Sequence, residues 1–317
     1  MISIAHKAKH FLLVLTKFLL VGFAFYYLYS QFQDKNAVNF KWITAKISFF
    51  SFVGIVLLSL LNWFFEILKW KNLVSSFHKI SFNQAAEQSL GSLTASIFTP
   101  NRVGEYIAKC LYYSKEKSKR IVFLNFLGNF TQMMVTVLFG LVGLLFYFVL
   151  SPFNLNFLIQ ESGFLFWLPV LLVLVFLILL FYFKRLNFYG FSIEKLKIKM
   201  QLFPARKHFA NVQYSFIRYL LFSHQFYFLL LIFQVEIPYP DAMLTIFTMY
   251  FLASIIPSIH LMDVVIKGSV AVFLFGNLGV NEWIILSVTL AMWFLNLVIP
   301  VVIGSFYVLK YNPNRKA

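Results

Sequence analysis

Two acid–base pairs are the residues most able to do chemistry in this apolar chain. Glu105 precedes Lys109, and Asp263 precedes Lys267, in each case by four positions. This spacing places acid and base on one face of a helix in the favourable order. Each pair follows a proline, and a helix that begins after a break points its unpaired N–H groups and positive dipole end at the gap. The pattern therefore predicts two places where an anion can be held.

A basic residue stands at each of these breaks, Arg102 after Pro100 and His260 after Pro257. With the neighbouring pairs, they predict two dipole-assisted sites suited to a phosphate or another anionic head group. The same residues also have a structural interpretation. The pair next to Arg102 can be a solvated ion pair, and His260 can be a satisfied interior histidine.

Polar side chains also follow the helices on either side of the first break. The segment leading into it has a polar, small face, and the next long apolar stretch carries polar residues at a 4-3-4 spacing. Such stripes can line a pathway or let helices pack closely. The predicted pathway-lining residues are Glu87, Gln88, Ser92, Asn129 and Gln132. Glu66, with Lys69 one turn away, is interpreted as an end-of-helix ion pair.

The elements that must position these residues are membrane-spanning helices. A chain of 317 residues that is 61% hydrophobic and only 12% charged is too apolar for a soluble protein. A span needs about 20 apolar residues, and six stretches qualify: 11–30, 47–68, 121–150, 164–183, 213–235 and 284–309. Two more, 82–113 and 242–276, contain a central proline with charges beside it. These predict broken or re-entrant helical hairpins.

Basic residues predict the orientation of the chain. Twenty Lys and Arg fall in segments on the side of both termini and three fall on the other side, which predicts cytoplasmic termini at an inner membrane. The excess of basic residues therefore reflects their concentration in cytoplasmic loops and does not indicate nucleic-acid binding. The longest loop, 185–212, is expected either to lie on the anionic inner leaflet or to be an ordinary solvated loop. Cys110 is the single cysteine, so we expect no disulfide, no metal site and no cofactor.

An internal repeat relates the two halves of the chain. An offset of 158 places Glu105 on Asp263, Lys109 on Lys267 and Arg102 on His260. Each half, 1–158 and 159–317, would contribute three spans and one broken pair. Each half would then cross the membrane an odd number of times, so the second repeat is expected to have inverted topology. The two hairpins would then enter the membrane from opposite faces.

Enzyme motifs are missing from the sequence. It has no phosphate-binding lysine loop, nucleophile elbow or zinc-binding helix motif, so we expect no enzyme and name no catalytic residue. Two alternatives stay open. One is a membrane-embedded transferase acting on a lipid-linked substrate with isolated acids in outer loops, for which Asp34 or Asp241 would be nearest. The other is an accessory scaffold of a lipid-synthesis complex.

The segment SLTASIFTPNRVGEYIAKCLYY resembles a flippase-like family named for the transmembrane region of lysylphosphatidylglycerol synthases. The residues that carry the match are Thr99, Pro100, Arg102, Gly104 and Glu105. The later stretch FLASIIPSIHLMDVVIKGSVAVFLFGNLGVNEW looks like the second motif of that family. The resemblance implies a polytopic fold whose better-known members move aminoacylated phospholipids between leaflets, while archaeal relatives are linked to lipid-carried glycans. Larger members append a cytosolic transferase after these helices, and without one we do not expect lipid aminoacylation.

The sequence thus predicts an all-α polytopic membrane protein that moves an amphiphile across the inner membrane without ATP. The expected partners are membrane lipids with an anionic head group, such as a phospholipid or a lipid-linked precursor. The expected substrate-binding residues are Arg102, Glu105, Lys109, His260, Asp263 and Lys267. The sequence does not predict the oligomeric state.

Overall fold

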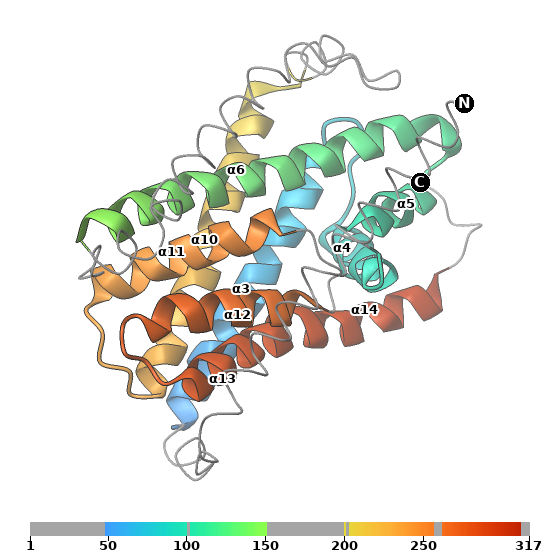
Figure 1. Cartoon of the computed structure of the whole chain (residues 1–317). Helices are drawn as coiled ribbons and strands as arrows, with labels where there is room; N and C mark the ends of the chain where they lie inside the picture. Colours follow the sequence, from blue (N-terminus) through green and yellow to red (C-terminus); the bar gives the residue numbers. More distant parts are fainter. Residues whose placement is uncertain (1–47, 100–101, 151–199, 201–202, 257–261, 312–317) are drawn as a thin grey trace, which may run out of the picture.

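The computed structural model describes residues 48–99, 102–150, 200, 203–256 and 262–311, with the side chains of 147–150 left aside. Within these ranges the chain is helical and contains no strand (Figure 1). The elements are α3 (Phe49–Val74), α4 (Phe82–Ser96), α5 (Val103–Leu111), the 3₁₀ turn η1 (Lys115–Lys117), α6 (Ser118–Leu150), α10 (Ala205–Ile232), α11 (Tyr239–Ile255), α12 (Asp263–Gly276), α13 (Glu282–Trp293), the π-helical turn η3 (Phe294–Val298) and α14 (Ile299–Lys310).

Four helical segments in this part of the chain are long and apolar enough to cross a membrane: Phe49–Val74, Lys115–Phe146, Ala205–Ile232 and Glu282–Lys310. They correspond to four of the six predicted spans. The predicted spans 11–30 and 164–183 lie outside the described residues. Large apolar side chains such as Phe50 and Leu309 are exposed on these segments, as expected of helices that face lipid. The described part is a helical multi-pass membrane protein.

Both predicted broken stretches are divided into two helices near their prolines. The first becomes α4 and α5, and the second becomes α11 and α12. Ser81 starts α4 with a capping box, because its hydroxyl accepts the N–H of Gln84 and the Gln84 side chain accepts the N–H of Ser81. Pro238 precedes α11, whose first turn contains Pro240, a position where a missing N–H costs nothing.

The predicted loop 185–212 is too long, because α10 begins inside it. The helix begins at Ala205, after Pro204, so the last eight residues of that loop are its first two turns. Asn211 in these turns is fully buried and donates to the Thr131 hydroxyl of α6 at 2.7 Å. Burial of this face explains why the helix extends beyond the apolar run. Residues 185–199 lie outside the described residues.

The helices pack around two large apolar cores, and a smaller third one lies between α6 and α11. One core joins α10, α11, α12 and α13 around Phe226, Phe275 and Ile246, and the other joins α3, α4 and α6 around Trp70, Leu73 and Leu124. α3 lies against α10, α11 against α6, and α4 against α14 (Figure 1). The two broken pairs thus each lie beside a long span from the other half of the chain.

The last span contains one irregular turn. Between α13 and α14 the backbone forms the π-helical turn η3, and such turns occur often at functional positions. The side chain of Asn296 in this turn accepts from Asn62 at 2.9 Å and from Ser59 at 3.3 Å, and it donates to Gln225 at 2.9 Å. This one amide therefore bonds the last span to both α3 and α10.

Candidate functional site

The turn between α4 and α5 is closed by the residues of the first motif. The Thr99 hydroxyl donates to the Ser96 carbonyl at 2.7 Å and accepts the N–H of Gly104 at 3.0 Å. A Cβ on Gly104 would lie 2.8 Å from the Thr99 side chain and 3.1 Å from the Ser96 Cα, so the turn requires glycine there. Arg102 caps α5 with φ 60°, a left-handed conformation, and is exposed. Its side chain therefore stands at the N-terminus of α5, where the helix dipole is positive.

Glu105 and Lys109 form a buried pair instead of a solvated one. The Lys109 Nζ donates to Glu105 Oε1 at 2.7 Å and to Asn125 Oδ1 at 2.8 Å, and it lies 4.0 Å from the centre of a Trp70 ring. The two side chains are 8% and 2% exposed, respectively. Lys109 therefore ties α5 to both α3 and α6, and the structural interpretation of a solvated pair is wrong.

The polar face of α4 is engaged by neighbouring side chains. Gln88 is buried, and its Oε1 accepts from Trp70 Nε1 and from the Tyr113 hydroxyl, each at 2.8 Å. Burial raises the pKa of Tyr113 to about 12, so its hydroxyl stays protonated as a donor at neutral pH. Ser92 is buried and donates to the Ser89 carbonyl of its own helix at 3.1 Å, whereas Glu87 is half-buried. The described contacts of Gln88 and Ser92 are those of packing residues.

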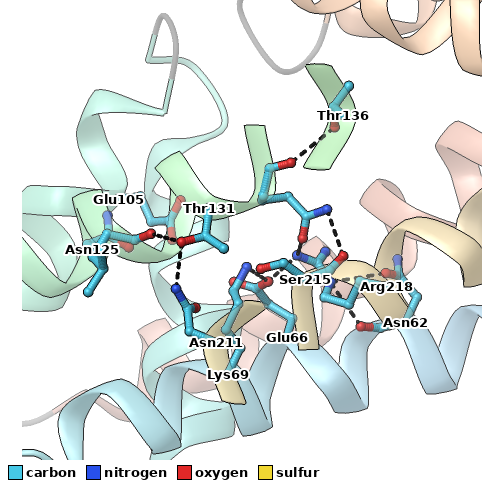
Figure 2. A network of polar contacts seen from close by, with 12 residues as sticks. Asn62, Glu66, Lys69, Glu105, Asn125, Thr131, Thr136, Asn211, Ser215 and Arg218 are labelled. Carbon is cyan, nitrogen blue, oxygen red and sulfur yellow. Dashed lines mark hydrogen bonds and ion pairs between the residues drawn. The ribbon is translucent and has the colours of Figure 1, made fainter. Parts of the chain in front are cut away.

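Glu66 lies at the centre of a second group of charges, shown in Figure 2. Its Oε2 accepts from Lys69 Nζ at 2.7 Å and also from Nη1 of Arg218, which comes from α10. Arg218 further donates through Nε to the Asn62 Oδ1 at 3.1 Å and through Nη1 to the Gln132 Oε1 at 3.2 Å. The predicted Glu66–Lys69 pair is present, but it is part of a buried contact between helices.

The polar stripe of α6 faces these charges. Gln132 donates to the Ser215 carbonyl at 3.2 Å while accepting from Arg218. Asn129 lies near the Tyr106 side chain of α5. Asn125 is 2% exposed and accepts from Lys109. The stripe lies in the interior of the bundle, as the 4-3-4 spacing predicts.

Glu66, Lys69, Glu105, Lys109 and Arg218 form what we call the central charge cluster. Its two parts meet at Trp70, the neighbour of Lys69 on α3, because the Lys109 Nζ lies 4.0 Å from the centre of the Trp70 ring. The cluster therefore lies on α3, α5 and α10.

The second break gives a more open arrangement. Asp263 and Lys267 pair at 2.6 Å, with side chains 28% and 36% exposed. Lys267 also lies 5.8 Å from the centre of the Tyr250 ring. His260, the third predicted residue of this half, lies outside the described residues. The described geometry thus brings together Arg102, Glu105 and Lys109 in one half and Asp263 with Lys267 in the other.

Sequence reasoning missed Arg218 and Asn296. Arg218 is the one Lys, Arg, Asp or Glu in the apolar stretch 213–235, and a charge inside a span indicates a functional site. That signal was available in the sequence. Asn296 carried no comparable signal, because its role follows from the π-helical turn that turns it toward α3 and α10.

Metal binding has no support in the described part of the chain, where no three His, Cys, Asp or Glu side chains come together. The cluster holds more cations than carboxylates, which favours anions over metal ions as ligands.

A family model described as the lysylphosphatidylglycerol synthase TM region matches residues 14–304. The match spans all the helices from α3 to α13 and the first half of α14. It confirms the resemblance that the motif around Arg102 carries. No curated protein matches the chain.

Proposed function

Because the chain belongs to the family of the lysylphosphatidylglycerol synthase transmembrane region, we propose that it translocates an amphiphile with an anionic head group across the cytoplasmic membrane. The amphiphile is a phospholipid or a lipid-linked precursor, and the movement uses no ATP. In this proposal the chain is a transporter and not an enzyme.

The observation that carries the proposal is the central charge cluster. Glu66, Lys69 and Arg218 lie on α3 and α10, which are long and apolar enough to cross a membrane, and Glu105 and Lys109 lie on the short α5; all five side chains are at most 11% exposed. A charge at membrane depth costs roughly 2.5 to 3.5 kcal/mol on insertion scales, so such residues are found mostly where they serve a substrate or ion pathway. A purely structural bundle would be expected to pack the same positions with apolar side chains.

Two inverted repeats would give the transporter two related halves that expose the substrate site to each side of the membrane in turn. The offset of 158 carries α3 onto 207–232, which is nearly α10, and α4 onto 240–254, which is nearly α11. It also carries α6 onto 276–308, close to the segment Glu282–Lys310. These coincidences support two repeats, 1–158 and 159–317, and the proposal adds re-entrant hairpins, six spans and cytoplasmic termini.

Substrate contact begins, in this proposal, at Arg102. It is exposed at the N-terminus of α5, where its guanidinium and the helix dipole both favour a phosphate. The buried pair Glu105–Lys109 holds α5 in place behind it. On the other half, the same role would fall to His260 with Asp263 and Lys267. Glu87, Gln88, Ser92, Asn129 and Gln132 would form the walls of the route.

Reconstituted vesicles test the proposal. Wild-type protein should move a head-group-labelled phosphatidylglycerol faster than a labelled phosphatidylcholine. Arg102→Ala should abolish most of this difference and Arg102→Lys should restore it only in part, because a lysine lacks the planar fork of arginine. Arg206→Ala, which changes an exposed arginine on α10, is the control. Equal movement of both lipids by wild type, or an undiminished rate in Arg102→Ala, would remove the proposal.

A further inference from the structure

The central charge cluster carries one more positive than negative charge. Its cations are Lys69, Lys109 and Arg218, and its carboxylates are Glu66 and Glu105. The side chains are at most 11% exposed. Each carboxylate already accepts from a lysine, and Glu66 also accepts from Arg218. Within the described residues, the cluster therefore needs one further anion to be neutral.

One unused hydrogen-bond donor lies beside the cluster. The Nδ2 of Asn125 is buried with no partner among the described residues, while its Oδ1 accepts from Lys109. A buried donor without an acceptor destabilises the folded state. The excess positive charge and this donor point to the same kind of ligand, an anionic acceptor.

We propose that the central charge cluster, together with Asn125, is a binding site for one phosphate group. A phosphodiester carries one negative charge at neutral pH, which balances the excess, and its oxygens can accept from a guanidinium and an amide. This inference rests on the proposed function, since a substrate lipid would supply the phosphate. Free phosphate offers the same chemistry. Arg102 is exposed at the N-terminus of α5, the helix that carries Glu105 and Lys109.

Thermal unfolding of the purified full-length protein in an uncharged detergent tests the site without any transport. Three additives are compared in phosphate-free buffer: inorganic phosphate, a short-chain phosphatidylglycerol and a diacylglycerol with the same chains. A ligand that binds the folded state raises Tm with its concentration. We expect a rise of a few degrees with a phosphate-bearing additive and none with the diacylglycerol.

Asn125→Asp is the sharpest variant. It keeps the shape and the acceptor for Lys109, and it supplies the missing negative charge from the protein itself. We expect a higher Tm than wild type without additive, and an at least tenfold weaker response to the phosphate-bearing additive. Arg218→Gln should also lose the response, and Arg206→Gln, an exposed position on the same helix, should keep it. If Arg218→Gln does not fold, Asn125→Asp decides alone.

The three additives separate the sources of the phosphate. Stabilisation by phosphatidylglycerol, with or without inorganic phosphate, supports a lipid head-group site, and stabilisation by inorganic phosphate alone supports a free-ion site. No stabilisation by either, or an unchanged response in Asn125→Asp, overturns the inference. Binding is measured here and movement in the vesicle assay, so movement without binding would remove this inference and leave the proposed function standing.

Discussion

Arg218 of α10 is bonded to Glu66 of α3, although 152 positions separate them in the chain. The same carboxylate oxygen also accepts from Lys69. One buried anion therefore holds two cations, one from its own helix and one from a neighbour. The contact fixes how α3 and α10 face each other at the centre of the bundle.

Removing the shared carboxylate is expected to cost more stability than removing one cation. Glu66→Gln leaves Lys69 and Arg218 buried without their shared carboxylate, and it should lower the free energy of unfolding by about 3 to 5 kcal/mol. Arg218→Gln preserves the Glu66–Lys69 pair and should cost clearly less. Denaturant titration in detergent micelles measures both, with Arg206→Gln as the unaffected control. Equal losses for the two variants would show that Glu66 does not serve both cations.

Close packing of α14 on α4 depends on Gly304. A Cβ at this position would overlap the Leu90 carbonyl and the Thr94 hydroxyl, and overpacking costs about 1 to 3 kcal/mol. Gly304→Ala should therefore lower Tm. Gly276→Ala is the matched control, because nothing lies within 4 Å of a Cβ there, and it should leave Tm unchanged or raise it slightly. A Tm for Gly304→Ala equal to that of wild type would mean that α4 and α14 lie farther apart.

Asn296 links three helices through its side chain. Asn296→Ala removes its side-chain bonds to Ser59, Asn62 and Gln225. Interhelical bonds in membranes average roughly 0.6 kcal/mol each, so we expect a loss of about 2 kcal/mol in unfolding free energy. Asn83→Ala, at an exposed position on α4, serves as the control in the same titration. A loss no greater than that of Asn83→Ala would contradict the role of this amide.

The proposed topology can be read from single cysteines in a Cys110→Ala background. Glu116→Cys lies in η1 before α6, and Val280→Cys lies between α12 and α13. We expect a membrane-impermeant maleimide added to intact cells to label residue 280 only, and residue 116 to react once the membrane is opened. Labelling of both from the outside would eliminate the inverted arrangement.

Local features of the fold were predictable and long-range ones were not. Prolines with charges beside them predicted both broken stretches, and the four-residue spacing predicted that Glu105 meets Lys109. Spacing does not tell which face of a helix is buried, so it left open whether that pair is solvated. The contact between Glu66 and Arg218 depends on how α3 crosses α10, which no periodicity encodes. The start of α10 at Ala205 was missed because polar residues such as Asn211 are buried by partners on α6.

The π-helical turn η3 sets the rotation of the last span at two contact points. Asn296 bonds to α3 and α10, and Gly304 packs against α4. A π turn corresponds to one extra residue in an α-helix, and each residue of an α-helix turns the chain by about 100°. Deleting one residue from 294–298 would therefore rotate α14 and carry Gly304 away from Leu90. Inserting one residue between Val298 and Gly304 would turn α14 back. The deletion and the insertion together should therefore restore the packing that the deletion alone disrupts.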